Sequence, residues 1–253
     1  MVLRILGAAD WRPDLNNDHA CYLLDGHILI DCCSGVLMNL INGGADPAGI
    51  DLILFTHMHP DHFLGLPSLL HYQRTRNRTL REITILGPKE MLERAAELSM
   101  EVAFFGDGGS DEEPVLVPLA GGDPFTFDRY RIRTLPARHS VPGLCYRVTE
   151  VGSEKSVGFT GDTMAHPEMS AFFRGVDLLV HEATFGAEEL PGFNSVCRHS
   201  NARMAVRTAE EAGAGRLLLT HAGASKWEAA VELARSLTDI PADWAWPGRE
   251  ITL

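Results

Sequence analysis

The chain has 253 residues, of which 45% are hydrophobic, so it is long enough to enclose a substantial core. No stretch approaches the ~20 apolar residues needed to cross a bilayer, which argues against a membrane-spanning protein. The net charge of −12 excludes the overall basic footprint of proteins that bind nucleic acid by general phosphate contact.

Short apolar runs in the first half of the chain predict strands, and amphipathic segments between them predict helices. The expected strands are Val2–Gly7, Ala20–Leu24, His27–Asp31, Leu52–Thr56 and Ile83–Leu86. The expected helices are Gly35–Ile41, Leu64–Tyr72 and Pro88–Ser99.

The second half of the chain repeats this order of elements. Its expected strands are a hairpin over Phe125–Leu135, then Leu144–Thr149, Val157–Thr160, Leu178–His181, Leu217–Thr220 and Glu250–Leu253. Helices are expected at Asn201–Ala212 and Lys226–Leu237, the first with Ser200 as its N-cap and Gly213 as its stop. Strands in hairpins, then strands alternating with helices, twice over, favour an α/β fold: two mixed sheets packed face to face with helices outside.

The most informative segment directly follows the predicted strand Leu52–Thr56. It places His57, His59, Asp61 and His62 at H-x-H-x-D-H spacing, where a rigid sheet can hold ligands that stay open to solvent on the loop side. Imidazole and carboxylate ligands suit zinc, manganese or iron, and the lack of a thiolate argues against a closed structural zinc site. The alternative, a histidine-rich surface turn, fits this dense spacing poorly.

Three further ligand-type residues stand at the ends of apolar runs, as the first cluster does. They are His139, Asp162 and His221. Any one of them alone would more often be a capping or core residue. Taken in this order after H-x-H-x-D-H, they indicate a single metal centre assembled from strand ends.

With all of these positions matched, the chain resembles the metallo-β-lactamase fold hydrolases. The family's pattern is H-x-H-x-D-H, then a His, an Asp and a His, each at a strand end, and the resemblance covers essentially the whole chain. It implies an αββα sandwich and two divalent metal ions, with zinc preferred and manganese or iron as alternatives. One ion would be held by His57, His59 and His139, and the second by Asp61, His62 and His221, with Asp162 bridging them.

Further motifs resemble the ribonuclease Z and phosphodiesterase branch of that family. His181-Glu182-Ala183-Thr184 resembles its H-E-A-T motif and His199-Ser200 its H-S-T motif, while His139-Ser140-Val141-Pro142 with Tyr146-Arg147 resembles its third motif. The resemblance assigns Asp61, Glu182 and His199 to catalysis. For Glu182 and His199 the alternative is a helix-capping acid and a surface imidazole.

The chain departs from ribonuclease Z in three places. Only Val148 to Ser156 fills the region in which that enzyme carries a long Gly/Pro-rich arm that grips transfer RNA. The turn that usually reads G-x-G-S is Gly7-Ala8-Ala9-Asp10, and Cys145 stands where a glycine is usual. The missing arm argues against transfer RNA and predicts a small phosphodiester or a short nucleic-acid end as substrate. A homodimer partner that supplies the missing grip is left open.

The charge of such a centre favours an anionic substrate. Two divalent cations, two aspartates and a bridging hydroxide leave a local charge of about +1. The sequence therefore predicts an enzyme, a dinuclear metal-dependent phosphodiesterase or nuclease that acts through a metal-bridging hydroxide. His199, tuned by Glu182, would protonate the leaving alkoxide. The alternatives are a carbonyl-ester hydrolase of the same fold, such as a lactonase or thioesterase, and a non-catalytic metal-binding protein.

One basic segment stands out on this acidic chain. Arg74, Arg76, Arg78 and Arg81 lie between a predicted helix and a predicted strand. They form either a solvated turn or a rim patch that attracts a phosphorylated substrate.

The remaining features concern compartment and domain number. The first six residues run directly into a strand, without the regions of a signal peptide. Five cysteines, including the adjacent Cys32 and Cys33, indicate reduced thiols. We expect a cytoplasmic protein with one domain over residues 1–253.

Overall fold

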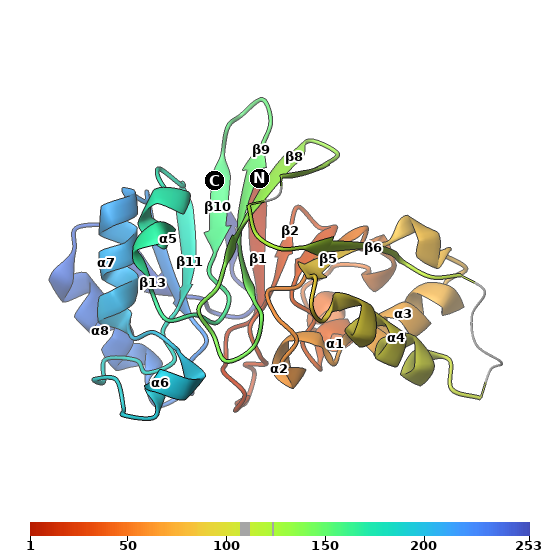
Figure 1. Cartoon of the computed structure of the whole chain (residues 1–253), viewed down its shortest axis with the longest axis horizontal. Coiled ribbons are helices and arrows are strands. Elements are labelled where there is room, and N and C mark those ends of the chain that lie inside the picture. Colours follow the sequence, from red (N-terminus) through yellow and green to blue (C-terminus); the bar gives the residue numbers. More distant parts are fainter. Residues whose placement is uncertain (107–111, 123) are drawn as a thin grey trace.

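Two sheets form the centre of the molecule (Figure 1). The computed structural model describes residues 1–106, 112–122 and 124–253. The first sheet runs, in spatial order, β14 (Glu250–Thr252), β1 (Val2–Gly7), β2 (Cys21–Leu24), β3 (Ile28–Ile30), β4 (Leu52–Leu54), β5 (Thr84–Pro88) and β6 (Val115–Leu119). The second runs β13 (Ala242–Trp244), β12 (Leu217–Thr220), β11 (Leu178–Glu182), β10 (Ser156–Phe159), β9 (Leu144–Glu150), β8 (Tyr130–Pro136) and β7 (Phe125–Phe127).

Both sheets are mixed in the same way within the described residues. In the first, the pairs from β14 to β3 are antiparallel and those from β3 to β6 are parallel. In the second, the pairs from β7 to β10 are antiparallel and those from β10 to β13 are parallel. Parallel strands therefore bring several carboxyl ends to one edge of each sheet.

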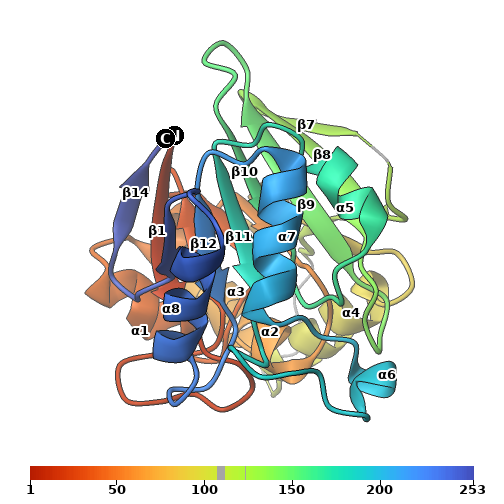
Figure 2. The ribbon, with the colours of Figure 1, turned by 90° about the vertical axis from the view of Figure 1, so that its left-hand side faces the viewer.

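Helices cover the outer faces of the two sheets (Figures 1 and 2). α1 (Val36–Asn42), α3 (Leu66–Thr75) and α4 (Leu92–Ala103) lie on the first, and α5 (Pro167–Phe172), α7 (Ala202–Ala212) and α8 (Trp227–Leu237) on the second. Two shorter helices, α2 (Pro60–Phe63) and α6 (Asn194–Cys197), and 3₁₀ turns at Pro47–Gly49 and Leu80–Glu82 complete the elements. The predicted sandwich of two mixed sheets with helices outside is confirmed.

Strand β4 shows why the apolar runs are continuous rather than alternating. Leu52 and Leu54 belong to the core that includes side chains of both sheets, whereas Ile53 belongs to the core beneath α1, α3 and α4. A strand buried on both faces needs apolar side chains at every position. Burial of each such side chain contributes about 1.5–3 kcal/mol to folding.

Several predicted boundaries are wrong for identifiable reasons. Helix α4 begins at Leu92 rather than Pro88, because Gly87 and Pro88 still pair with β6. The N-cap of α7 is Asn201 rather than Ser200, since the Asn201 side chain accepts a hydrogen bond from the Met204 amide at 3.0 Å. Gly213 ends this helix in a left-handed conformation, as predicted.

The connection between β9 and β10 is a tight turn. The Glu150 amide donates to the Lys155 carbonyl at 2.9 Å, so the two strands join with no room for an arm. This region is fully described, and the short connection expected from the sequence is confirmed.

None of the helices in the described part of the chain combines the length and apolar character that a bilayer crossing demands.

Candidate metal centre

The centre lies where strand ends from the two sheets meet. His57 and His59 follow β4, and α2 carries Asp61 and His62 immediately afterwards. The second sheet supplies the others, with His139 on the loop between β8 and β9, Asp162 after β10 and His221 after β12. The two sheets are joined at this point, because the Leu144 amide donates to the Thr56 carbonyl at 2.8 Å.

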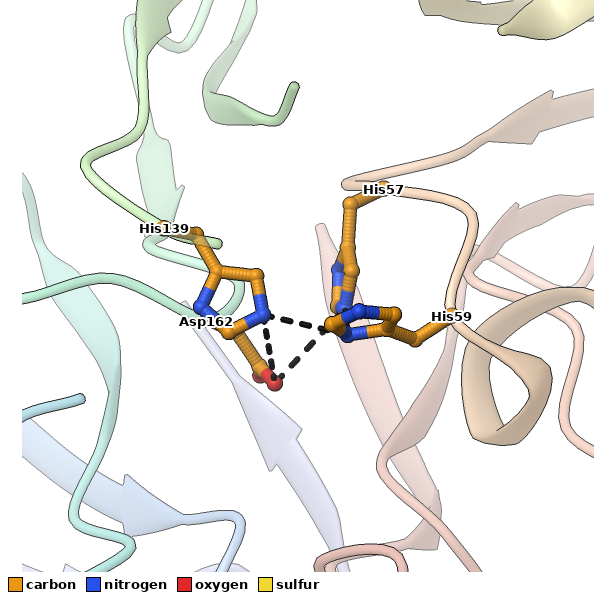
Figure 3. Close-up of side chains that lie close together, drawn as sticks. All are labelled: His57, His59, His139 and Asp162. Carbon is orange, nitrogen blue, oxygen red and sulfur yellow. Dashed lines mark hydrogen bonds and ion pairs between the residues drawn. The ribbon is translucent and has the colours of Figure 1, made fainter. Parts of the chain in front are cut away.

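A first group consists of His57, His59, His139 and Asp162, whose side chains point toward one another from the segments after β4, β8 and β10 (Figure 3). The His59 Nδ1 atom lies 3.1 Å from Nε2 of both His57 and His139. The Asp162 Oδ2 atom lies 3.7 Å from the His57 Nε2 atom and 3.9 Å from that of His139.

A second group consists of Asp61, His62 and His221, and Asp162 faces it as well. The Nε2 atoms of His62 and His221 are 3.4 Å apart, and they lie 3.4 and 3.5 Å from the Asp61 Oδ2 atom. Asp162 approaches them at 3.6 Å through Oδ1 and 3.3 Å through Oδ2. The structure thus brings together all the ligand candidates proposed from the sequence.

These spacings fit a cation held between the side chains. Tetrahedral ligands at about 2.0–2.1 Å from a zinc ion lie about 3.3 Å from one another, close to the separations seen in both groups. Burial lowers the pKa of His139 to about 4 and also lowers the pKa values of His57 and His59. Lowered pKa values favour the neutral imidazole, which is the form that binds a metal ion. The cluster suits a divalent metal ion.

A buried aspartate that the sequence did not single out orients His62. Asp31 accepts hydrogen bonds from the Thr56 amide at 2.7 Å, the Thr56 hydroxyl at 2.8 Å and the His62 Nδ1 atom at 2.8 Å. This leaves the Nε2 atom of His62 to face the centre, as a partner behind a metal-binding histidine does. Its signal was an acid at the end of β3, the parallel neighbour of β4.

Glu182 supports both His199 and His221. Its carboxylate accepts from the Thr163 amide at 2.8 Å, the Thr184 hydroxyl at 2.7 Å and the His199 Nδ1 atom at 2.9 Å. The Thr184 hydroxyl in turn accepts from the His221 Nδ1 atom at 2.9 Å. One fully buried carboxylate therefore fixes a candidate ligand and the histidine beside it.

His199 is held as a cation at the edge of the centre. Burial alone would lower its pKa, but the Glu182 carboxylate outweighs burial and raises this pKa to about 10. Burial would likewise raise the pKa of Glu182, yet His199 brings that pKa down to about 2. The His199 side chain is 15% exposed, and its ring centroid lies 4.8 Å from that of His139. It can therefore exchange a proton with a group bound at the centre.

Because His199 binds its proton more tightly in the folded chain, its charge makes stability pH-dependent. After chelation of metal, the stabilisation should be complete below about pH 6.5, the ordinary histidine pKa, and be lost as pH rises towards about 10. His199→Gln should therefore show a smaller fall in unfolding free energy over this range, measured by urea denaturation. His71→Gln, at an exposed histidine of α3, is the control. Identical profiles for His199→Gln and wild type would contradict the assignment.

Gly161 and His221, which flank the centre on the second sheet, have left-handed backbone conformations. Gly161 has φ of 56°, and an added Cβ would lie 2.6 Å from the Thr56 Cβ, so glycine is required just before Asp162. His221 has φ of 57°, and its amide donates to the Ala8 carbonyl at 2.8 Å. The N-terminal turn therefore helps to hold a candidate ligand in a conformation that costs energy.

Arg78, in the arginine-rich segment, makes its contacts away from this centre. Its guanidinium binds the Ala48 and Ile50 carbonyls and forms an ion pair with Asp51, which precedes β4. The centre follows the opposite end of β4. Arg78 therefore fixes the chain before β4 and does not belong to the rim of the centre, and its paired, half-buried side chain is not part of a solvated turn either.

Known proteins share this sequence pattern and fold. A family of sequences described as "Beta-lactamase superfamily domain" matches residues 27–222, which include every ligand candidate. A ribonuclease Z from Methanothermobacter thermautotrophicus is 27% identical, with 96% of this chain and 95% of that protein covered. A ribonuclease Z from Pyrobaculum arsenaticum is 31% identical, with 81% and 80% covered.

The fold comparison agrees with the sequence comparison. The crystal structure of the metallo-β-lactamase fold protein YhfI from Bacillus subtilis matches with a TM-score of 0.82 at 23% identity, covering 99% of this chain and 98% of that one. The resemblance recognised in the sequence is confirmed, and the chain belongs to the β-lactamase superfamily domain family.

Proposed function

We propose that the protein is a metal-dependent phosphodiesterase or nuclease. The observation that carries the proposal is the Glu182–His199 pair, a buried carboxylate holding a protonated imidazole beside a cluster of metal-ligand side chains. Relatives named ribonuclease Z, aligned over most of the chain, support it.

The metal assignments belong to the same proposal. One divalent ion would be held by His57, His59 and His139, a second by Asp61, His62 and His221, and Asp162 would serve both. Zinc is the preferred metal, with manganese or iron as alternatives, because the set is imidazole and carboxylate without thiolate. When bound, such ions lower the pKa of water towards neutrality and stabilise the charge that develops on a phosphate.

The surrounding residues orient the reacting groups. Asp31 and Thr184 fix the rings of His62 and His221 from behind. The Nδ1–H group of His199 is committed to Glu182, which leaves the proton on Nε2 to be donated to a leaving alkoxide. This proton transfer distinguishes a phosphodiesterase from the alternative, a lactonase or thioesterase, because ester leaving groups need less help from a general acid.

The expected substrates are small diesters or short nucleic-acid ends. The short turn between β9 and β10 offers no arm with which to grip a folded RNA. Substrate selection would therefore depend on the rim of the centre itself.

The test compares bis(p-nitrophenyl) phosphate with p-nitrophenyl acetate after chelation and stepwise return of metal. Diester hydrolysis should be abolished by chelation and restored by metal, and a folded transfer RNA precursor should be cleaved more slowly than the diester. Metal-dependent hydrolysis of the acetate alone would favour the carbonyl-ester alternative. Hydrolysis of neither substrate at full metal occupancy would favour the non-catalytic one.

A further inference from the structure

Arg198, beside the proposed proton donor, has no role in the function described so far. We propose that its guanidinium forms a subsite for a second phosphate group, carried by the part of the substrate that leaves. The inference rests on the proposed function, because it takes the scissile phosphate to lie at the metal centre.

The position of Arg198 comes from one contact. Its Nη1 atom donates to the His139 backbone carbonyl at 3.4 Å, so the guanidinium lies against the backbone of a residue whose ring belongs to the first group. Arg198 also immediately precedes His199, whose ring lies beside that of His139. The cation is therefore on the side of the centre where the leaving oxygen would receive its proton.

The charge of Arg198 is uncommitted. Other arginines near the centre are neutralised, with Arg12 paired to Asp10 at 2.7 Å and Arg138 to Glu168 at 3.2 Å. Arg198 is exposed, and within the described ranges no carboxylate forms an ion pair with it. The single contact with the His139 carbonyl leaves most of its five N–H donors available to a ligand.

The backbone that carries this cation is held in place. Arg198 has φ of 60°, the left-handed region that a long side chain rarely adopts. The buried Asn194 side chain holds the next residue at both ends, accepting from the His199 amide at 2.7 Å and donating to its carbonyl at 2.9 Å. Because the backbone at this point is already fixed, less conformational entropy is lost when a ligand binds to the Arg198 side chain.

These features define the chemistry of the ligand. A guanidinium binds a phosphate through paired hydrogen bonds, which a carbonyl or a sugar hydroxyl cannot match. With one phosphate at the centre and its leaving oxygen near His199, the second phosphate must belong to the leaving fragment. A nucleotide end bearing a further phosphate meets this description.

The experiment uses thymidine dinucleotides with no terminal phosphate, with a 5′-phosphate or with a 3′-phosphate. Product analysis on the wild-type protein shows which fragment leaves. Arg198→Gln should raise KM by about 10- to 100-fold for the dinucleotide whose leaving fragment is phosphorylated, the usual range for a lost charge-assisted contact. The other two should change by less than about threefold, and Arg198→Lys should recover part of the loss.

Arg133→Gln is the matched control, since it removes one positive charge from an exposed position on β8. Equal KM increases on all three dinucleotides, a fall in kcat alone, or the same selective effect in Arg133→Gln would each overturn the subsite. Titration calorimetry with inert phosphonate-linked dinucleotides separates the two proposals. If the inert dinucleotide with a terminal phosphate binds more tightly in an Arg198-dependent way but none of the cleavable dinucleotides is hydrolysed, the subsite stands and the phosphodiesterase proposal is refuted. If the inert dinucleotides bind equally well with and without a terminal phosphate, the subsite is refuted.

Discussion

Replacing His199 with alanine should slow hydrolysis of a diester with a poor alkoxide leaving group by roughly 10²–10⁴-fold. The reason is that the raised pKa keeps His199 protonated at neutral pH, and its free nitrogen can supply the proton that an alkoxide needs. On bis(p-nitrophenyl) phosphate, whose phenolate leaves without protonation, the loss should be much smaller. Steady-state rates on the two substrates measure the difference.

Two controls distinguish a loss of proton donation from damage to the fold or loss of metal. Glu182→Gln should produce the same selectivity for leaving group more mildly, because it removes only the charge that orients and tunes the imidazole. Metal content of His199→Ala should match the wild type, and the variant should remain folded at the assay temperature. Equal losses on both diesters would mean that His199 has a structural role and is not the proton donor.

Metal analysis should find two divalent ions per chain in protein purified without a chelator. Asp162→Ala should lower the occupancy of both sites, because this carboxylate faces both groups of side chains. His221→Ala should empty mainly the second site. Asp31→Asn, which leaves the candidate ligands intact, should weaken the second site by about 10–100-fold. Elemental analysis across a metal titration measures all three.

The exposed histidine of α3 provides the control for this series, since His71→Ala should retain both ions. A wild-type protein that saturates with one ion per chain would contradict the dinuclear assignment. So would an Asp162→Ala variant that loses one ion and binds the other with unchanged affinity.

Most of the ligand candidates could be found in the sequence because they lie within a few residues of the end of a predicted strand. His57, Asp162 and His221 all follow strands, and the fold brings these strand ends to one place. This pattern involves only neighbouring residues, so it can be recognised in the linear sequence. The partner of His62 is different, because Asp31 lies 31 positions earlier and only the parallel pairing of β3 with β4 brings it into contact.

The elements missed from the sequence are those in which local preference is weakest. β6 contains Pro118 and is an edge strand, a position where proline is tolerated but where it obscures the strand pattern. β13 is an edge strand of the second sheet. It is only three residues long and has Asp243 at its centre. Ser200 was expected to cap α7, yet its hydroxyl donates to the Thr163 carbonyl at 2.7 Å, a contact across 37 positions.

The division of the candidate ligands between the two sheets has a consequence for synthesis of the protein. His57, His59, Asp61 and His62 are made early, but His221 follows β12 and comes 159 positions after His62. A growing chain on the ribosome would contain the ligand candidates of the first sheet long before those of the second sheet are made. Both ions could then bind only after the two sheets have packed together. A chain still being synthesised would therefore lack the proposed nuclease activity.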